Sequence, residues 1–462
     1  MEQLHGDILV VGLGASGEAA ATYCLQRAAN GDPVTVTVID SGDSDTLWAR
    51  AQRLGELGAS VHLGAAHVAG SYDLAIASPG IPPHAALMGE VREAAVEVIS
   101  ELEFAYRRSD ASWLAVTGTN GKTTVTSLLG HLLQAAGVSA TVVGNIGTPA
   151  ISMVDEAGPA GALVAEVSSF QLALTRDFHP RVSVLLNITP DHLDWHGDLE
   201  TYARDKARVF ARQNGEDTAI IDRDDSGAAL MIEEVRSQGV RVVEVSIGSI
   251  PAGGAGLAPD GTLTLDTVAG GLGLVHRDDL LIKGDHNVSN ALAASAAAHA
   301  FGAPTDAIAA GLRTFEPIEH RLEPVGVLRG VEYFNDSKAT NPDAALKALG
   351  ALVERDVVML LGGRNKGAHF GELGRAMARA GARAIVFGEA AEQIAGDLQA
   401  SGVAFERAGR LPDAVRMAAA LARPGGAVVL SPACASFDEF SGYAERGSVF
   451  RRLVCEMAEG EV

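Results

Sequence analysis

Short apolar runs alternate with helix-length segments through residues 1–99. The runs at 7–11, 34–39 and 72–77 are rich in Val, Ile, Leu and Ala, and they end at a glycine turn, at Asp40 and at the turn Ser78-Pro79-Gly80. An alanine-rich stretch of helical length follows the first run, and a second helix-length stretch lies between the other two. Apolar strands that alternate with helices are typical of a parallel sheet with helices on its faces.

The same alternation begins again after a polar break at residues 106–112. Further strands are predicted at 113–117, 140–143, 162–166 and 182–187, and the runs at 219–221 and 242–245 extend the sheet. A glycine-rich segment at 253–274 alternates like small antiparallel strands, and an alanine-rich helix is predicted at 287–300.

After residues 315–324 the pattern starts a third time. The strands VEYFNDS, VVMLLGG, AIVFGE and AVVLSPA are separated by helix-length segments. We therefore predict an α/β protein of three domains, at 1–99, 100–317 and 318–462. The outer two are predicted to be Rossmann-like, and the central one to be a parallel sheet like that of P-loop ATPases.

Composition removes several classes of function. A net charge of −22 argues against a nucleic-acid partner, because such a partner needs a basic face. Three distant cysteines make neither a metal spacing nor a disulfide framework. We find no signal pattern and no run of about 18 apolar residues. We expect a soluble, cytoplasmic protein with no membrane partner.

The stretch GTNGKTT follows the predicted strand at 113–117 and precedes a helix. Backbone N–H groups and a helix N-terminus would surround a phosphate there, Lys122 would reach the β- and γ-phosphates, and Thr123 would offer its hydroxyl to Mg²⁺. The full P-loop pattern requires a glycine where Val116 stands, so this loop is a shortened variant. A glycine turn without a ligand is the alternative.

A second glycine loop, GLGASG, contains Gly12, Gly14 and Gly17, and Asp40 follows at the spacing of a dinucleotide fingerprint. Alone, this pattern indicates a nicotinamide-dependent dehydrogenase. The same turn suits any diphosphate, and it can also be a tight strand–helix turn with no ligand.

Acidic and histidine side chains follow two predicted strands. Glu166 ends one strand, and the sequence NITPDHLDWHG places Asp191, His192, Asp194 and His196 after another. Carboxylate oxygens suit Mg²⁺, and a histidine can join them. A solvated polar loop is an equally good interpretation of this spacing.

Small polar residues and two lysines follow the strands of the third domain. They lie in NDSKATN (335–341), LGGRNKG (361–367) and SPACASFDEF (431–440). Such loops suit an anionic substrate that accepts hydrogen bonds, although Lys338 and Lys366 could also be surface lysines.

Together these motifs resemble those of the Mur ligase family, the ATP-dependent amide ligases of peptidoglycan precursor synthesis. The resemblance covers essentially the whole chain and rests on GTNGKTT, GNIG (144–147), EVSSFQL, ITPDHLDWHG, GDHNVSNALAA and EHRLE, in that order. The motifs of the third domain are most similar to those of members that add D-glutamate to UDP-N-acetylmuramoyl-L-alanine through an acyl phosphate.

The resemblance implies a role for each matching residue. The catalytic set is Lys122, His192 and Lys206, and the metal set is Thr123, Glu166, His192 and Lys206, the last as a carbamylated lysine that helps to hold a second Mg²⁺. The ATP set is Gly118, Thr119, Asn120, Gly121, Lys122, Thr123, Thr124, Asn287, Asn290, Arg321 and Asp336.

For the two other substrates the resemblance implies separate sets. The UDP-sugar would contact Gly14, Ala15, Ser16, Asp40, Ser41, Ser78, Pro79, Gly80, Asn145 and Ser168, so the first glycine loop would hold a diphosphate and no nicotinamide. D-glutamate would contact Lys338, Thr340, Lys366, Ser436 and Phe437.

The sequence departs from the family pattern at two places. The family often has an acidic residue where Arg364 or Asn365 stands, and Ser41-Gly42 replaces a Thr-Arg seen in some relatives. Three other classes of protein stay open: a nicotinamide oxidoreductase, a folate-type ligase and a nucleotide-binding regulator. We expect a monomer.

Overall fold

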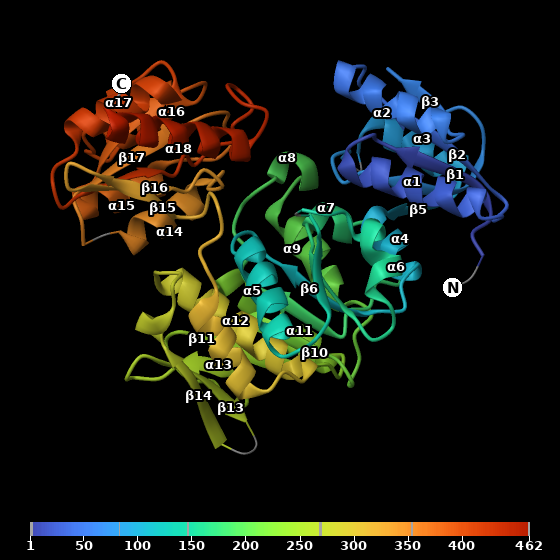
Figure 1. Cartoon of the computed structure of the whole chain (residues 1–462), viewed down its shortest axis with the longest axis horizontal. Helices are drawn as coiled ribbons and strands as arrows, with labels where there is room; N and C mark the ends of the chain where they lie inside the picture. Colours follow the sequence, from blue (N-terminus) through green and yellow to red (C-terminus); the bar gives the residue numbers. More distant parts are fainter. Residues whose placement is uncertain (1–2, 83, 146, 268–269, 353, 461–462) are drawn as a thin grey trace. The chain divides into compact units, whose positions relative to one another are not determined.

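A computed structural model describes residues 3–82, 84–145, 147–267, 270–352 and 354–460 (Figure 1). The chain forms two compact units. The first runs up to Ile188 and continues with Trp195–Leu280 and Val288–Thr314, whereas the second consists of Thr189–Asp194, Leu281–Asn287 and the chain from Phe315 onward.

The first sheet has five parallel strands in the order β3-β2-β1-β4-β5 (Figure 1). Its helices follow the strands in the chain, as the alternating pattern predicts. The elements are β1 (Gly6–Val11), α1 (Ala15–Ala29), β2 (Val34–Asp40), α2 (Asp45–Glu56), β3 (Ser60–Leu63), β4 (Tyr72–Ala77), α3 (Ala86–Ala94) and β5 (Ala95–Ser100).

The second sheet has nine strands in the order β14-β13-β12-β11-β10-β9-β6-β8-β7. Along this order, every pair of neighbours between β12 and β7 is parallel, β6 included. The pairs β12–β13 and β13–β14 are antiparallel. They are β6 (Ser112–Thr117), β7 (Ala140–Gly144), β8 (Ala162–Glu166), β9 (Val182–Leu185), β10 (Thr218–Asp222), β11 (Arg241–Ser246), β12 (Ala255–Leu257), β13 (Thr262–Thr267) and β14 (Gly270–His276).

Helices and short 3₁₀ turns connect these nine strands or follow them. They are α4 (Glu101–Arg107), α5 (Lys122–Ala135), η1 (Ala150–Met153), α6 (Val154–Ala157), α7 (Ser169–Leu172), α8 (Leu193–His196), α9 (Leu199–Ala207), η2 (Arg208–Phe210), α10 (Ser226–Ala229), α11 (Ile232–Ser237), η3 (Arg277–Asp279), α12 (Asp285–Phe301) and α13 (Thr305–Thr314). The predicted helix at 287–300 is α12, whose alanine-rich part from Ala291 to Ala298 is buried.

The third sheet has the order β15-β16-β20-β17-β18-β19, and only β15 is antiparallel to its neighbour. Its elements are β15 (Glu323–Leu328), β16 (Val331–Asn335), α14 (Pro342–Ala351), β17 (Val357–Gly362), α15 (Gly371–Ala380), β18 (Arg383–Phe387), α16 (Ala391–Ala400), β19 (Phe405–Arg407), α17 (Leu411–Leu421), β20 (Ala427–Leu430) and α18 (Tyr443–Glu459).

The first two sheets share one hydrophobic core. It runs from Ile8 and Tyr23 through Phe104 on α4 to Trp113 and Ile221 in the second sheet. The rings of Tyr23 and Phe104 meet edge to face at 5.8 Å, so α4 packs against both layers. The predicted α/β class is confirmed; the predicted boundaries at 99/100 and 317/318 stay a prediction.

Candidate functional site

The loop GTNGKTT leaves the end of β6 and turns directly into α5. Gly118 and Gly121 have φ values of +148° and +85°, which residues with a Cβ rarely adopt. Asn187, just beyond β9, holds the loop from the neighbouring strand: the N–H of Asn120 donates to its Oδ1 at 2.7 Å, and its Nδ2 donates to the Asn120 carbonyl at 3.0 Å.

Lys122 is the first residue of α5, and its ammonium group turns back over the loop. Its Nζ donates to the carbonyls of Gly118 and Thr119, both at 2.8 Å. Thr123 and Thr124 are buried in the first turn of the helix. A helix N-terminus beside a lysine attracts phosphate oxygens, so the predicted phosphate loop has a fitting local geometry.

Asn290 on α12 lies against this loop. A Cβ built on Gly121 would stand 2.6 Å from its Oδ1, so the loop and the predicted adenine-side residue are in close contact. The other predicted ATP residues, Asn287, Arg321 and Asp336, belong to the second unit.

Lys206 lies on α9 and is only 1% exposed, which rules out a surface lysine. Its Nζ donates to the Gly118 carbonyl at 2.8 Å and lies 4.5 Å from the centre of the Tyr202 ring. The hydroxyl of Tyr202 donates in turn to Thr119 Oγ1 at 3.1 Å. Helix α9 therefore reaches the phosphate loop through two side chains.

Glu166 ends β8 and is 2% exposed. Asn145, in the loop after β7, donates from its Nδ2 to Glu166 Oε1 at 2.9 Å, and its backbone N–H donates to the Glu166 carbonyl at 2.8 Å. Ser168 caps α7 and exchanges hydrogen bonds with Gln171. The GNIG motif that contains Asn145 also includes Ile146, which lies outside the described residues.

The residues present fit a magnesium ion. Within the described part of the chain, no three His, Cys, Asp or Glu side chains gather into a metal site. Mg²⁺ differs from zinc in this respect, because it is usually held by one or two carboxylates together with substrate phosphates and water. The buried Glu166 carboxylate and the Thr123 hydroxyl are oxygen donors of that kind.

His192 lies in the second unit, in the segment Thr189–Asp194. It has a positive φ of 54°, and its Nε2 is 3.7 Å from Asp191 Oδ2. The Asp191 carboxylate also accepts hydrogen bonds from Lys366 Nζ and from Asn341 Nδ2, both at 3.2 Å. Sharing of one metal by Glu166 and His192 stays a prediction.

His196 does not lie in an acidic loop with His192. It ends the short helix α8, and its side chain is buried against Ser169 and Asp205 in the first unit. The interpretation that grouped His196 with the metal-binding candidates is therefore wrong, because Ser169 and Asp205 already engage both of its ring nitrogens.

In the third sheet, the loops after β16, β17 and β20 meet. Asp336 accepts a hydrogen bond from Ser431 Oγ at 2.7 Å, and burial raises the pKa of its carboxyl to about 7. Arg446 on α18 is fully buried and donates to the carbonyls of Ser337 at 2.8 Å and Cys434 at 3.1 Å.

The five residues predicted to bind the amino acid follow these strands. Lys338 Nζ lies 5.1 Å from the centre of the Tyr443 ring, and Lys366 pairs with Asp191 as described above. Thr340 is half-buried, Ser436 is buried, and Phe437 is 63% exposed. The structure thus brings their loops together and leaves the Phe437 ring in solvent.

The first sheet brings three predicted loops to the carboxyl ends of β1, β2 and β4. Asp40 accepts hydrogen bonds from the N–H groups of Leu13 at 2.6 Å and Gly42 at 2.7 Å. A Cβ built on Gly12 would come within 2.6 Å of Ser78, so these turns touch. Gly14 caps α1, which begins at Ala15 and Ser16, while Ser41, Pro79 and Gly80 lie in the two other turns.

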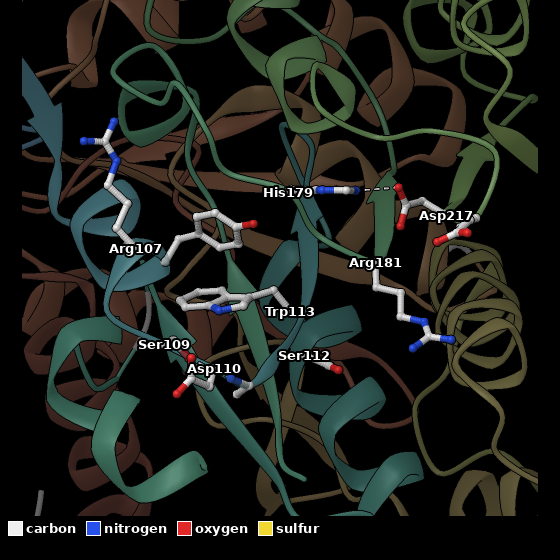
Figure 2. Close-up of a pocket in the computed structure, with 11 residues that line it drawn as sticks. Arg107, Ser109, Asp110, Ser112, Trp113, His179, Arg181 and Asp217 are labelled. Atoms are coloured by element: carbon white, nitrogen blue, oxygen red, sulfur yellow. Dashed lines mark hydrogen bonds and ion pairs between the residues drawn. The ribbon is translucent and has the colours of Figure 1, made fainter. Parts of the chain in front are cut away.

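A pocket of about 510 Å³ opens at the other end of the second sheet, beside the first residues of β6, β9 and β10 (Figure 2). It contains none of the predicted site residues. Figure 2 shows Arg107 and Arg181 pointing to opposite sides, and His179 is paired with Asp217 at 2.6 Å. The two arginines diverge, and the histidine is already paired with a carboxylate. The pocket therefore offers no set of side chains that converge on one ligand.

Sequence reasoning missed Asn187, Tyr202 and Arg446. Asn187 was included only as the end of a strand, although a polar residue at a strand's carboxyl end is a signal for a site. Tyr202 stands four residues before Lys206, which places both on one face of a helix. Nothing in the sequence around Arg446 marks it as buried.

Comparisons with known proteins agree with this geometry. Residues 116–298 match the Mur ligase middle domain, and residues 320–434 match the Mur ligase glutamate ligase domain. Proteins of Pelotomaculum thermopropionicum and Frankia casuarinae, each named UDP-N-acetylmuramoylalanine--D-glutamate ligase, are 41% and 42% identical. They align over 98% and 97% of this chain and over 98% and 93% of their own lengths.

Solved structures show the same fold at low identity. UDP-N-acetylmuramate-alanine ligase from Thermotoga maritima has a TM-score of 0.59 at 19% identity, covering 99% of this chain and 100% of its own. MurF from Acinetobacter baumannii has a TM-score of 0.62 at 19% identity, covering 97% and 93%. The predicted three-domain fold class is confirmed.

Fold and sequence together define an ATP-dependent, ADP-forming ligase. The chain belongs to the Mur ligase family. The family resemblance of the motifs is thereby confirmed, and the nicotinamide oxidoreductase and the non-enzymatic regulator are set aside. Among the described helices, none is both long and apolar enough to cross a membrane.

Proposed function

We propose that this ligase joins D-glutamate to UDP-N-acetylmuramoyl-L-alanine, with release of ADP and phosphate, in the cytoplasmic stage of peptidoglycan precursor synthesis. Full-length relatives with about two fifths identity, all named for that reaction, carry this proposal. The use of ATP is supported by the phosphate loop, in which Lys122 and Lys206 both donate a hydrogen bond to the Gly118 carbonyl. We propose a monomer, which light scattering would test.

Three substrate regions follow from this function, one for each predicted domain. Residues 1–99 would bind the UDP-sugar, with Ala15 and Ser16 facing its diphosphate and with Gly14 and Asp40 among the other contacts. Residues 100–317 would bind ATP through the phosphate loop and Asn290. Residues 318–462 would bind D-glutamate through Lys338, Thr340, Lys366, Ser436 and Phe437, and would contribute Arg321 and Asp336 to the nucleotide.

The reaction has two steps. A carboxylate oxygen of the L-alanyl group forms a bond to the γ-phosphorus while the bond to the bridging oxygen breaks, which releases ADP and leaves an acyl phosphate. The amine of D-glutamate then attacks the carbonyl carbon, inorganic phosphate leaves, and a proton is released from the nitrogen. Phosphoryl transfer of this kind depends on positioning and on neutralising charge.

Lys122 suits the first of these steps. Its ammonium group stands at the start of α5, over the loop that would surround the phosphates, so it can neutralise charge that develops on the γ-phosphoryl oxygens. Bound Mg²⁺, which we expect as two ions near Thr123, Glu166 and His192, would supply further neutralisation of the phosphate charge.

We further propose that Lys206 is carbamylated in the working enzyme. Burial of its amine beside Tyr202 and Gly118 supports this, because carbamylation converts a buried cation into a carboxylate-like metal ligand. Lys206→Ala should be inactive and partly regain ligation when a short carboxylic acid is added. Full activity of Lys206→Ala without any addition would contradict the carbamate.

The decisive experiment measures phosphate release with ATP and UDP-N-acetylmuramoyl-L-alanine, with D-glutamate or L-glutamate as the variable. We expect release with D-glutamate alone. The matched control is Lys122→Ala, which should lose about 10²-fold or more in rate, the effect typical of one missing electrostatic contact. Equal rates with both enantiomers, or none with D-glutamate, would overturn the proposal.

A further inference from the structure

A buried chain of hydrogen bonds passes through His196. Ser169 Oγ lies 2.9 Å from His196 Nε2, and His196 Nδ1 lies 2.8 Å from Asp205 Oδ2. The imidazole is completely buried, and Ser169 is 2% exposed. A carboxylate can only accept, so Nδ1 carries the proton toward Asp205; in the neutral ring, Nε2 then accepts from the Ser169 hydroxyl.

The three residues come from three separate segments, and each segment carries predicted site residues. Ser169 begins α7, directly after Ser168 and shortly after Glu166. His196 ends α8, in the stretch that begins with His192. Asp205 precedes Lys206 on α9. One imidazole therefore ties α9 to the end of β8.

Aromatic rings hold the imidazole in place. The Phe170 ring stacks on the imidazole, with 5.4 Å between the ring centres and an interplanar angle of 18°. The centre of the Trp195 ring lies 4.4 Å from that of the imidazole, and the Tyr202 ring meets it edge-on with 5.1 Å between the centres. Tyr202 is also the residue that donates to Thr119 in the phosphate loop. The packing thus continues from His196 to the loop.

The order Ser-His-Asp is that of a nucleophilic triad, but the surroundings argue against one. A nucleophile must be reached by its substrate, whereas Ser169 is buried in the first turn of α7 and aromatic rings enclose its histidine. What the arrangement can do is fix the orientation of α9, because a ring with two directional hydrogen bonds allows little rotation.

We propose that His196 is a positioning residue: by joining Ser169 to Asp205 it holds α9 in register, so that Lys206 and Tyr202 reach the phosphate loop. The catalytic part of this inference rests on the proposed function. A shift of about 1 Å in a catalytic group can cost about 10²-fold in rate, and loss of a residue that orients a ligand typically costs about 10–100-fold.

The test compares His196→Ala with His179→Ala in the full-length protein. His179 pairs with Asp217 at 2.6 Å at the opposite end of the same sheet. Its replacement therefore also removes a histidine–aspartate pair, but one that lies far from the phosphate loop. Hydrogen exchange of residues 118–124 and 199–207 should speed up in His196→Ala and stay unchanged in His179→Ala. For ligation, kcat should fall about 10–100-fold in the first and less than about 2-fold in the second.

Two substitutions at Asp205 separate positioning from general loss of packing. Asp205→Asn keeps an oxygen that accepts from Nδ1, so it should behave nearly like the wild type. Asp205→Ala removes the acceptor and should reproduce the faster exchange and lower kcat of His196→Ala, with KM for both amino acid and ATP changed less than about 3-fold. Ser169→Ala tests the other hydrogen bond if His196→Ala does not fold.

Unchanged exchange at 118–124 in His196→Ala and Ser169→Ala, or equal acceleration in His179→Ala, would overturn the positioning role. So would a normal kcat in folded His196→Ala. The exchange experiment uses no substrate, so a wild-type protein that fails to ligate D-glutamate would overturn the proposed function while the exchange result still decides the role of His196.

Discussion

At Gly121 a single backbone conformation connects the sequence to the candidate ATP site. Its φ of +85° lies in the left-handed region, where a residue with a Cβ pays about 1–2 kcal/mol. A Cβ there would also stand 2.6 Å from Asn290 Oδ1. The glycine is therefore required twice, by the turn and by the approach of α12.

We expect Gly121→Ala to raise KM for ATP by about 10-fold or more, because both the loop and Asn290 must move. The matched control is Gly137→Ala after α5. Gly137 has a similar φ of +80° but no atom within 4 Å of its Cβ position, so only stability should fall. Nucleotide titration and thermal unfolding of the two variants separate the effect of backbone strain from that of the contact with Asn290. Equal ATP affinity in both variants would contradict a role for that contact.

Glu101 gives a pH dependence whose sign follows from its burial. It begins α4, accepts the Ile151 N–H at 2.7 Å, and burial raises the pKa of its carboxyl to about 7. The folded state then holds a proton that the unfolded chain releases near the ordinary carboxyl pKa of about 4.5. The stability contributed by this group is greatest at low pH and is lost as pH rises through about 7.

Glu101→Gln mimics the protonated form, so its Tm should exceed that of the wild type above about pH 7, and the difference should shrink toward about pH 5. Glu97→Gln should show the opposite trend. The hydrogen bond from Arg107 lowers the pKa of Glu97, so its replacement should cost stability at neutral pH and less in acid. A pH-independent difference for Glu101→Gln would contradict the raised pKa.

Residue chemistry at strand ends was predictable from sequence, but burial by distant segments was not. Lys122 and Glu166 follow apolar runs, and that position marks them. The burial of Lys206 depends on Gly118 and Tyr202, and that of His196 on Ser169 and Phe170. No periodicity in one segment reveals a partner that lies many residues away in another.

Among the secondary-structure elements, the strands that are buried on both faces were the clearest to predict. Strands such as β8 and β17 are fully buried, so their apolar runs are continuous and their bounds are clear. The missed strands are β3, β5, β15 and β19, which lie at sheet edges. Edge strands are partly exposed, so polar residues interrupt them, as Glu97 does in β5.

Helix α18 illustrates how one element joins two loops. Arg446 donates to carbonyls of the loops after β16 and β20, and burial lowers the pKa of its guanidinium to about 10. We expect Arg446→Met, which keeps the length, to lower Tm and to raise KM for D-glutamate more than about 10-fold. Each buried carbonyl left without a donor costs about 1–3 kcal/mol.

The control on the same helix is Arg452→Met. The Arg452 side chain is 66% exposed and pairs only loosely with Glu456, so its loss should change neither quantity measurably. Steady-state kinetics with D-glutamate as the varied substrate, beside thermal unfolding, measure both. An unchanged KM in Arg446→Met would show that the two loops keep their positions without it.

At the scale of the whole molecule, two sheets in the first unit share one core, and Glu103 is central to that union. This buried carboxylate on α4 accepts the N–H groups of Arg176, Asp177 and Phe178 at 2.9, 2.9 and 3.0 Å. Arg107 on the same helix donates to Glu103 at 2.8 Å and to Glu97 on β5. The first sheet is thus tied to the second through α4.

We therefore expect the first and second sheets to unfold together, although the sequence pattern treats them as separate domains. In native-state hydrogen exchange, the slowest amides of β1 and β6 should report one opening free energy in the wild type. Glu103→Ala leaves three backbone N–H groups without their acceptor, of which that of Phe178 is buried, so β1 should open at a lower free energy than β6. Glu233→Ala, which removes an exposed ion pair on α11, should leave the two equal. Different opening free energies in the wild type would mean that α4 links the sheets without making them cooperative, because a shared core couples two layers only if neither is stable alone.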